Sequence, residues 1–367
     1  MKVLIINETG NESRYWIDAI LGLKNKNLAI SKASIRERGK LDSQLENLGI
    51  PTFALNSSSS IDYPKAIARL AKIIASGKYD VIHASEAIPA SIAGLACKMV
   101  GVKTCIYHRH NVEIEGASGL NILDKIASRS SNLLMAVSHA AAQGARRNNV
   151  SKEKIQVAHN GVKPLRPVTS CELSQLRNSL QIPHEAKVIL MVSRLRKIKG
   201  HEVLINAVKI FESKSPYDIH VVIVGEGEEG KSLRNKAVSN EHTKFHFVGH
   251  KEDVAPWFKM ADVVAMPSFS EAMPLSAVET ISAGKVLIAS DVGGIPEIIE
   301  NGKSGILVPP GDAESLADAL LQILNSPNLA KRIGENAENR FFKDFTIEKM
   351  IDGWIRCYSH IMHNVGK

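Results

Sequence analysis

Two acidic side chains, Glu271 and Glu279, are the first residues whose type and spacing suggest chemistry, and seven residues separate them. Glu271 follows the short apolar run from Ala261 to Met266, which reads as a buried strand. Glu279 lies within Leu275 to Ala283, where apolar residues recur at the spacing of a helix buried on one side. We therefore expect Glu271 in a loop after a strand and Glu279 in the helix that follows.

The surroundings of this pair indicate a ligand that carries both phosphate and sugar. Ligands of open α/β sheets bind outside the carboxyl ends of the strands. The start of the helix there offers free N–H groups and a partial positive charge, which suit a phosphate. A carboxylate can only accept hydrogen bonds, so its natural partners are hydroxyl groups. Together these features predict a nucleotide-sugar.

The segment from Lys187 to Asp312 carries a resemblance to a known family. The E-x7-E pattern is followed by G-K-V-L-I-A-S-D-V-G-G-I-P-E-I-I and then by G-I-L-V-P-P-G-D. This set resembles glycosyltransferase family 4, densely over residues 187–312 and more loosely before them. The resemblance implies a retaining, metal-independent hexosyltransferase of the GT-B fold, with two Rossmann-like doubly wound α/β domains facing each other across a cleft. The alternative is a Rossmann-type helix whose two glutamates are merely solvated.

The resemblance also implies roles for individual residues. Arg194 and Lys199 match the family's R-L and K-G positions, which clasp the donor diphosphate and stabilise its departure. Glu271 is expected to meet the transferred sugar and Glu279 the ribose hydroxyls. The donor-binding set is completed by Gly10, Gly225, Val254, Met273, Leu275 and Ser276. For Gly10, an ordinary strand-to-helix turn remains an equal alternative.

Two histidines follow the expected strand Thr104 to Tyr107. The resemblance implies that a histidine in this loop lies against the transferred sugar near its anomeric carbon. His108 matches best by register, and His110, one pleat further on, is left open. A metal site is disfavoured, because two histidines lack a nearby carboxylate or cysteine and Arg109 between them would repel a cation. Plain surface histidines are the other alternative.

The chain of 367 residues is long enough for two domains. Alternating strand-like and helix-like runs predict doubly wound parallel sheets. We expect an acceptor-binding domain over residues 1–165 and a nucleotide-sugar domain over residues 166–345. Residues 346–367 are expected to form a helix that returns to the first domain. The expected strands of the first half include 2–7, 28–33, 52–55, 81–84, 104–107 and 132–137, and those of the second half 187–192, 220–224, 245–249, 261–266 and 286–289.

Cysteine usage and hydropathy bear on the compartment. The four cysteines are scattered without C-x-x-C spacing, which disfavours a disulfide framework or a zinc site and fits a reducing cytoplasm. The apolar run at the N-terminus is too short for a signal peptide. No stretch is apolar for long enough to span a bilayer. We therefore expect a cytoplasmic protein.

The positive charge is confined to the first half. Residues 1–165 hold 22 Lys and Arg against 13 Asp and Glu, whereas the remainder holds 24 against 25. The helix expected from Pro64 to Ser76 carries Lys65, Arg69 and Lys72 on one side. Such a face suits an anionic membrane or a lipid-linked acceptor, although a solvated face is the commoner case. Aromatic residues make up only 5% of the chain, so nucleic acid is not an expected partner.

The predicted function is transfer of a sugar, from a uridine-linked donor, to a hydroxyl of a glycan or lipid-linked acceptor in surface polysaccharide or lipopolysaccharide synthesis. No cofactor is expected beyond the nucleotide-sugar substrate. A nucleotide-sugar epimerase or a phosphorylase of the same fold is the main alternative. A nicotinamide dehydrogenase is disfavoured because the first strand-to-helix turn lacks G-x-G-x-x-G. A non-catalytic binding module is disfavoured because Arg194, Lys199, Glu271 and Glu279 are all present.

Overall fold

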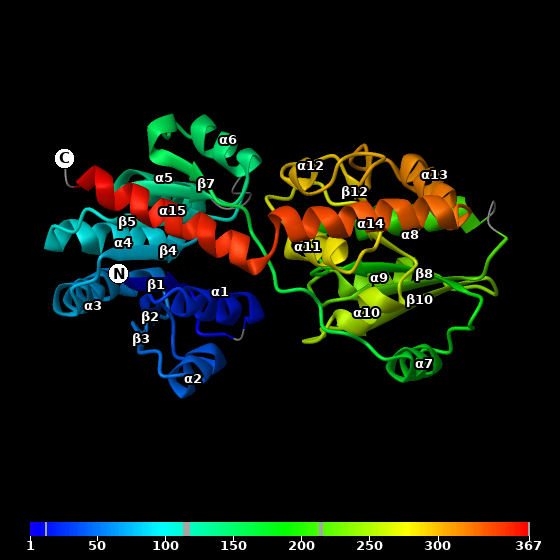
Figure 1. Cartoon of the computed structure of the whole chain (residues 1–367), viewed down its shortest axis with the longest axis horizontal. Helices are drawn as coiled ribbons and strands as arrows, with labels where there is room; N and C mark the ends of the chain where they lie inside the picture. The colour runs from blue at the N-terminus through cyan, green and yellow to red at the C-terminus, as the bar shows by residue number, and fades with distance from the viewer. Residues whose placement is uncertain (12, 113–117, 213–215, 366–367) are drawn as a thin grey trace. The chain divides into compact units, whose positions relative to one another are not determined.

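A computed structural model describes residues 1–11, 13–112, 118–212 and 216–365 of the chain. The chain divides into two compact units (Figure 1). The first comprises Met1–Val162 together with Ile347–Lys367, and the second comprises Lys163–Thr346. The sequence placed the two divisions at residues 165 and 345.

The first unit is built on a seven-stranded sheet in the order β3-β2-β1-β4-β5-β6-β7. Every neighbouring pair in this sheet is parallel. The order reverses between β1 and β4, so two successive connections leave in opposite directions from the sheet centre. The strands are β1 (Lys2–Asn7), β2 (Ala29–Ser34), β3 (Thr52–Ala54), β4 (Val81–Ser85), β5 (Cys105–Arg109), β6 (Leu133–Ala136) and β7 (Ile155–Val157).

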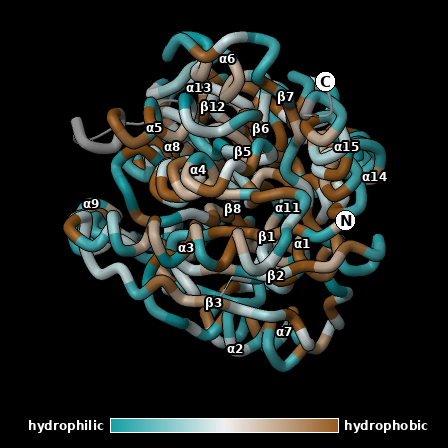
Figure 2. Tube along the Cα trace, turned by 90° about the vertical axis from the view of Figure 1, so that its left-hand side faces the viewer, coloured by the Kyte–Doolittle hydropathy of each residue, from teal (hydrophilic) through white to brown (hydrophobic). Residues whose placement is uncertain are grey.

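Helices cover both faces of this sheet. One face carries an apolar core built with α1, α2 and α15, and the other is covered by α3, α4 and α5, which pack on one another in that order. Figure 2 shows brown hydrophobic residues on inner segments and teal ones on outer helices such as α2. The helices are α1 (Arg14–Asn25), α2 (Lys40–Asn47), α3 (Tyr63–Gly77), α4 (Ala87–Val100), α5 (Ser118–Ser130), α6 (His139–Arg147) and α15 (Ile347–Val365), with short 3-10 turns η1 (Ser60–Asp62) and η2 (Lys152–Lys154).

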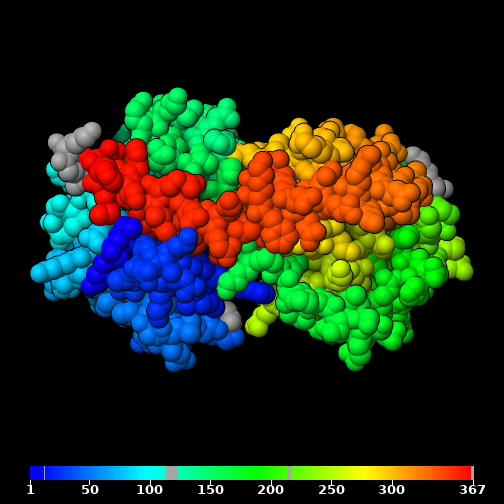
Figure 3. All heavy atoms as spheres, viewed as in Figure 1, coloured from blue at the N-terminus to red at the C-terminus, as the bar shows by residue number. Residues whose placement is uncertain are grey.

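The C-terminal helix α15 belongs to the first unit although it follows the second in sequence. It packs beside α1, and its residues Trp354, Tyr358 and Ile361 are buried in the same core as β1 and β4. Figure 3 shows α15, in red, across the surface of this unit next to the blue N-terminal segment. The expected return of the last helix to the first domain is what the structure shows.

The second unit is built on a six-stranded sheet in the order β10-β9-β8-β11-β12-β13. All pairs are parallel, and the order reverses between β8 and β11. Alternate residues face opposite sides, since Ile189 and Met191 join the core under α8 and α13 whereas Val188 and Leu190 are buried on the other face. The strands are β8 (Lys187–Val192), β9 (Ile219–Val224), β10 (Thr243–Gly249), β11 (Val263–Met266), β12 (Leu287–Ser290) and β13 (Ile306–Val308).

The helices of the second unit follow the same alternation with the strands. They are α7 (Ser170–Ser179), η3 (Lys197–Lys199), α8 (His201–Glu212), α9 (Gly230–Lys236), α10 (Ala255–Met260), α11 (Leu275–Ser282), α12 (Ile295–Ile298), α13 (Ala313–Leu324) and α14 (Pro327–Asp344). The two doubly wound parallel sheets confirm the predicted fold class. Within the described residues, we find no helix with the length and apolarity that a membrane crossing requires.

One expected boundary was wrong in a way that matters for the site. The strand expected to end at Tyr107 continues to Arg109. His108 and Arg109 stay in the sheet because their carbonyls accept hydrogen bonds from Glu86 N at 2.9 Å and Val137 N at 3.2 Å, on the two neighbouring segments. These residues are therefore part of a buried strand and not of a surface loop.

Candidate functional site

A group of charged side chains lies at the carboxyl edge of the second sheet, where its strand order reverses. β8 and β11 are neighbours there, although three helices and two strands separate them in sequence. The loop after β8 carries Arg194 and Lys199, and the loop after β11 carries Glu271. This is the position at which open α/β sheets form a ligand crevice.

Lys199 and Glu271 meet at this point. Lys199 Nζ lies 2.7 Å from Glu271 Oε1, and the two side chains are 20% and 7% exposed. Ser268 Oγ donates a second hydrogen bond to the same oxygen at 2.8 Å. Glu271 Oε2 makes no hydrogen bond to any residue that the structure describes. One carboxylate oxygen is thus fixed by the protein, and the other keeps its capacity to accept.

Backbone contacts hold the two loops against each other. Phe269 N donates to Ile198 O at 2.8 Å, which ties the β11 loop to the turn that carries Lys199. Gly200 ends that turn with a φ of +72°, and a Cβ on it would lie 1.9 Å from Pro267 O. Only glycine satisfies both the left-handed backbone and the close approach. The position of Lys199 is therefore set by the backbone.

Gly225 performs a similar task for Arg194. Its φ is +139°, and a Cβ on it would lie 1.9 Å from Ser193 O. Leu195 N also donates to Glu226 O at 2.9 Å, so the turn after β9 packs on the turn after β8. The Arg194 side chain is exposed, and it forms no ion pair with a described residue. A guanidinium held at this edge without a carboxylate partner remains available to an anion.

The start of α11 supplies backbone donors beside Glu271. Leu275 and Ser276 are the first two residues of this helix, so their N–H groups have no carbonyl partner within it. Met273, just before the helix, is buried, and Glu279 lies one turn further along, half-buried. Val254 is also half-buried, at the N-cap of α10 after β10. All of these predicted residues lie on segments that follow the carboxyl ends of strands in the second sheet.

Sequence reasoning missed two supporting residues of this site. Ser268 was read only as part of a polar turn, although its spacing to Glu271 is the S-x-x-E of a capping box and could have suggested the bond. His201 is 2% exposed, and its Nε2 shares a 3.1 Å hydrogen bond with Ser193 Oγ. Burial lowers the pKa of His201 to about 4. A neutral imidazole there braces the turn that bears Arg194.

His108 lies in a closed cluster of the first unit. Its ring has no exposed surface, and its Nδ1 is 3.0 Å from His83 Nε2. His83 Nδ1 is in turn 2.7 Å from the Tyr358 hydroxyl on α15. Trp354 packs edge-to-face on both histidines, with ring centroids 4.8 Å from His83 and 5.2 Å from His108. The predicted contact between His108 and a sugar therefore requires movement of this packing.

His110, the other histidine of the segment, is less enclosed. It lies one residue beyond the end of β5 and is partly exposed. Its ring centroid is 4.1 Å from that of His108. Burial lowers the pKa of His83 to about 3 and that of His110 to about 4. The pKa of His108 is lowered well below its ordinary value, first by burial and then by His110 and His83. All three rings are neutral near pH 7.

The opposite face of β5 explains why a charged residue lies between the two histidines. Arg109 is fully buried, and its Nη1 is 3.1 Å from Asp124 Oδ2 on α5. The Tyr107 hydroxyl donates to Asp124 Oδ1 at 2.6 Å. Tyr107 and Arg109 thus face α5, and His108 faces α15, as strand alternation requires. Arg109 is a structural residue of the interior.

Gly10 lies in the first turn of the first unit, against the protein itself. A Cβ on it would lie 1.9 Å from Asp42 Oδ2 and 2.4 Å from Gly39 N. Asp42 and Lys32 form a fully buried ion pair of 2.6 Å below this turn. The space beside the Gly10 Cα is therefore filled by protein atoms, which gives this glycine a packing role. Its predicted contact with a donor stays a prediction.

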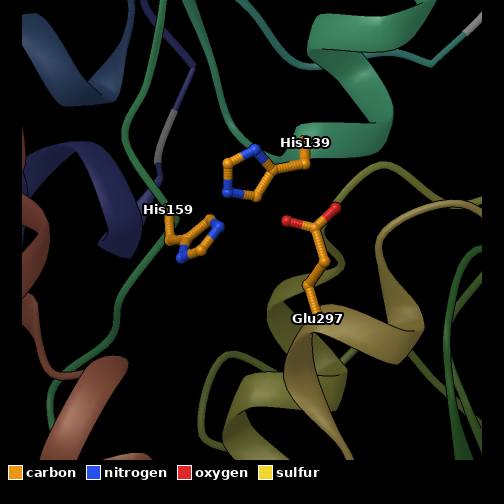
Figure 4. Close-up of side chains that lie close together, drawn as sticks. All are labelled: His139, His159 and Glu297. Atoms are coloured by element: carbon orange, nitrogen blue, oxygen red, sulfur yellow. The ribbon is translucent and has the colours of Figure 1, made fainter.

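Two more histidines lie at the carboxyl edge of the first sheet. His139 begins α6, and His159 follows β7. Their rings are edge-to-face with centroids 5.8 Å apart (Figure 4). Glu297, also labelled in that figure, is a residue of α12 in the second unit.

Comparisons with known proteins agree with this geometry. The family model described as Glycosyltransferase Family 4 matches residues 35–166, and the model described as Glycosyl transferases group 1 matches residues 174–340. N-acetyl-alpha-D-glucosaminyl L-malate synthase of Bacillus anthracis is 26% identical over 336 residues, covering 89% of this chain and 87% of that protein. An Escherichia coli UDP-Gal:alpha-D-GlcNAc-diphosphoundecaprenol alpha-1,3-galactosyltransferase is 25% identical over 323 residues, covering 85% and 83%.

Among solved structures, Anabaena HepE in complex with UDP has a TM-score of 0.83 at 21% identity, over 98% of this chain and 100% of that one. At that identity the likeness shows the fold. The two family models lie side by side along the chain and correspond to its two units, apart from the C-terminal helix. The chain belongs to the glycosyltransferases of the GT-B fold that these models describe, family 4 and group 1.

Proposed function

We propose that this protein is a retaining, metal-independent hexosyltransferase. It moves a sugar from a uridine-linked nucleotide-sugar to a hydroxyl of a glycan or lipid-linked acceptor in surface polysaccharide or lipopolysaccharide synthesis. The observation that carries this proposal is the meeting of Lys199 with Glu271, beside the unpaired Arg194, where the second sheet reverses its order. This arrangement offers positive charge and a sugar-binding carboxylate at one place.

The positive side chains stabilise the negative charge that develops on the leaving group during the reaction. As the bond between the anomeric carbon and the diphosphate oxygen breaks, its electron pair stays on the diphosphate. Arg194 and Lys199 stabilise that charge as it develops. The acceptor oxygen bonds to the anomeric carbon, and its proton leaves on a diphosphate oxygen. Two fixed cations thereby take the place of a divalent ion.

The carboxylates and amides position the donor. Glu271 accepts a hydrogen bond from a sugar hydroxyl through Oε2, because Lys199 and Ser268 already occupy Oε1. Glu279 accepts from the ribose hydroxyls. The amides of Met273, Leu275 and Ser276 bind phosphate and sugar oxygens at the start of α11. Gly225 and Val254 border the nucleotide.

The histidine assigned to the transferred sugar is His108 or His110. His110 is the partly exposed one, so it needs the smaller rearrangement to reach a ligand. His108 supports it from behind through the ring contact. Substitution of each by alanine separates the two roles, since loss of a sugar contact lowers turnover and loss of a support lowers stability.

The uridine assignment rests on the relatives. HepE was solved with UDP, and the Escherichia coli relative bears a UDP-sugar in its name. We also propose that the protein works at the cytoplasmic face of an anionic membrane. Residues 1–165 contain 22 Lys and Arg against 13 Asp and Glu, and this excess of nine positive charges supports such a location.

The first test is calorimetric binding of UDP, GDP, ADP, NAD and their sugar conjugates in the presence of EDTA. We expect tight binding of one nucleoside diphosphate, at least tenfold weaker in Glu279→Ala. The control is Glu314→Ala, an exposed acidic residue on α13 outside the site. Preference for NAD, or an absence of nucleotide binding, contradicts the proposal.

The second test follows the product. Turnover of the bound sugar nucleotide with a hydroxyl acceptor should persist in EDTA, and NMR should show the anomeric configuration of the donor retained. Epimerisation without acceptor, or cleavage that requires inorganic phosphate, assigns the protein to the epimerase or phosphorylase alternative.

A further inference from the structure

A cavity of about 640 Å³ opens at the amino-terminal edge of the first sheet. It is lined by the segments that precede three neighbouring strands, with Lys103 before β5, Asn132 before β6 and Lys154 before β7. His108 and His110 lie at the other end of β5. The cavity is therefore separate from the residues assigned to the glycosyl transfer.

The lining of this cavity is strongly basic. Lys98, Lys103, Arg129 and Lys154 face it, and Glu153 is the one acidic residue among the described residues of its lining. A second cavity of about 340 Å³ shares Arg129, Ser151 and Lys154 with the first and adds Lys125. The two cavities form one concave surface, which we call the amino-edge pocket. The lining also includes the hydroxyl groups of Ser131 and Ser151, whereas the Ser130 hydroxyl donates to Ile126 O at 2.7 Å.

Structural demands do not account for this many positive charges. The C-terminal ends of α4 and α5 lie at the pocket, with Lys98 and Arg129 in their last turns. Each helix end carries about half a negative charge, so the two together offset about one cation. Glu153 offsets one more. Of the five cations, about three therefore remain uncompensated.

The individual side chains agree with this count. Within the described chain, Lys98, Lys103, Lys125 and Arg129 form no ion pair, and all four are exposed. Lys154 Nζ is held by the carbonyl oxygen of Ser128. The pKa of Lys154 is lowered, mainly by burial and further by the positive charge of Lys98. The cations are thus close enough to repel one another.

We propose that the amino-edge pocket is a binding site for a phosphate group that carries at least two negative charges. Its lining of amine, guanidinium, hydroxyl and amide donors matches a tetrahedral anion with several acceptor oxygens. No aromatic side chain lines it, so base stacking plays no part. The phosphate belongs either to a small soluble molecule or to a lipid headgroup. This site does not depend on the proposed transferase activity.

The experiment uses the full-length chain and two double variants that remove the same charge. Lys98→Gln with Lys103→Gln changes the pocket. Lys331→Gln with Lys343→Gln changes the exposed side of α14, outside the basic first half of the chain, and serves as the control. Binding of inorganic pyrophosphate is measured by calorimetry on all three chains. The candidate donor site is the same in each, so a difference in affinity between them reports the pocket. Binding to vesicles that contain phosphatidic acid, whose phosphomonoester can carry two negative charges, with phosphatidylcholine as the reference, is measured by cosedimentation.

We expect the pocket variant to lose at least tenfold in affinity for pyrophosphate, for the anionic vesicles, or for both, while the α14 variant stays within twofold of the original chain. Loss in the pyrophosphate arm alone identifies a soluble phosphate ligand, and loss in the vesicle arm alone identifies a headgroup. The proposal is overturned if the original chain binds neither probe, or if the two variants weaken binding equally.

Discussion

The two sheets of this protein reverse their strand order in the same way, yet they fill the reversal point differently. In the second unit, charged side chains such as Lys199 and Arg194 reach that edge and remain wholly or partly exposed. In the first unit, the corresponding region beside β4 and β5 is packed with neutral rings, among them His83, His108 and Trp354. The shared topology positions both edges, and the side chains decide that one carries exposed charge whereas the other is filled by packed neutral rings.

The largest expected effect on stability comes from removing a large side chain from the packed rings of the first unit. Trp354→Ala should destabilise the first unit by about 3–5 kcal/mol, because it leaves a cavity among buried rings. Trp354→Phe should cost less, since the indole nitrogen has no hydrogen-bond partner in the described chain. Hydrogen exchange of the β4 and β5 amides measures the change. Phe342→Ala, at a ring 53% exposed on α14, is the control, and equal effects of the two alanine variants would contradict the assignment.

The next largest effect, on the rate of turnover, comes from removing a positive charge at the edge where the second sheet reverses its order. Lys199→Ala should lower kcat by about 100- to 1000-fold, because it removes one of the two groups that we propose stabilise the departing diphosphate. Lys197→Ala changes an exposed lysine of the same short turn and should stay close to the original rate. Steady-state kinetics on both variants compares them. A similar loss in the two would mean that general positive charge, and not the position of Lys199, matters.

The pH dependence of stability should report the buried histidines, beginning with those of the first unit. His83 and His110 have folded pKa values of about 3 and 4, below the ordinary 6.5. As the pH falls below 6.5, these histidines therefore bind protons in the unfolded chain but stay neutral in the folded unit. Stability is full above that pH and should fall by about 1.4 kcal/mol per pH unit for each such histidine down to its folded pKa.

Hydrogen exchange between pH 7 and 5 should show this loss in the first sheet. The second unit contains two comparable histidines, His201 and His220, each with a pKa lowered to about 4, so stability should fall there as well. A double replacement, His83→Gln with His110→Gln, should flatten the profile of the first unit even if it lowers the stability at pH 7. An unchanged slope would show that other groups control acid unfolding.

The smallest effect concerns the backbone where the first sheet reverses. Glu86 follows β4 with a φ of 71° and a ψ of 171°, a region that only glycine adopts without strain. Glu86→Gly should exceed Glu86→Ala in stability by about 1 kcal/mol, since both lose the side chain and only glycine relieves the strain. Urea unfolding measures the difference in stability between the two variants. A more stable Glu86→Ala variant would contradict the backbone strain at this position.

The sequence was most informative about the second unit. The strand bounds 187–192 were predicted to the residue, and the helix expected to end at Ala283 ends at Ser282. The pairing of Lys199 with Glu271 was not stated, but their placement after β8 and β11 follows from the alternation of strands and helices. Local patterns sufficed there because each site residue lies directly after an apolar strand.

The first unit was harder to predict, for physical reasons. His108 was predicted to lie in a loop because a run of polar residues normally ends a strand. The strand continues because Arg109 forms a buried ion pair with Asp124, which lets a charged residue lie inside the protein. The partners of His83 come from α15, 275 residues away in sequence for Tyr358. Buried pairs such as Lys32 with Asp42 also read as surface charge in a sequence. Contacts of this range have no local signal.

The order in which the chain is synthesised gives the position of α15 a further consequence. The second unit is complete when residue 346 has been made, whereas the first still lacks the helix that covers Trp16, His83 and His108. During translation the apolar face of β1 and β4 therefore stays uncovered until the residues of α15 have been made. A ribosome that stops before Trp354 releases a chain with a finished charged site and an unfinished first unit, which the quality-control proteases of the cell can recognise.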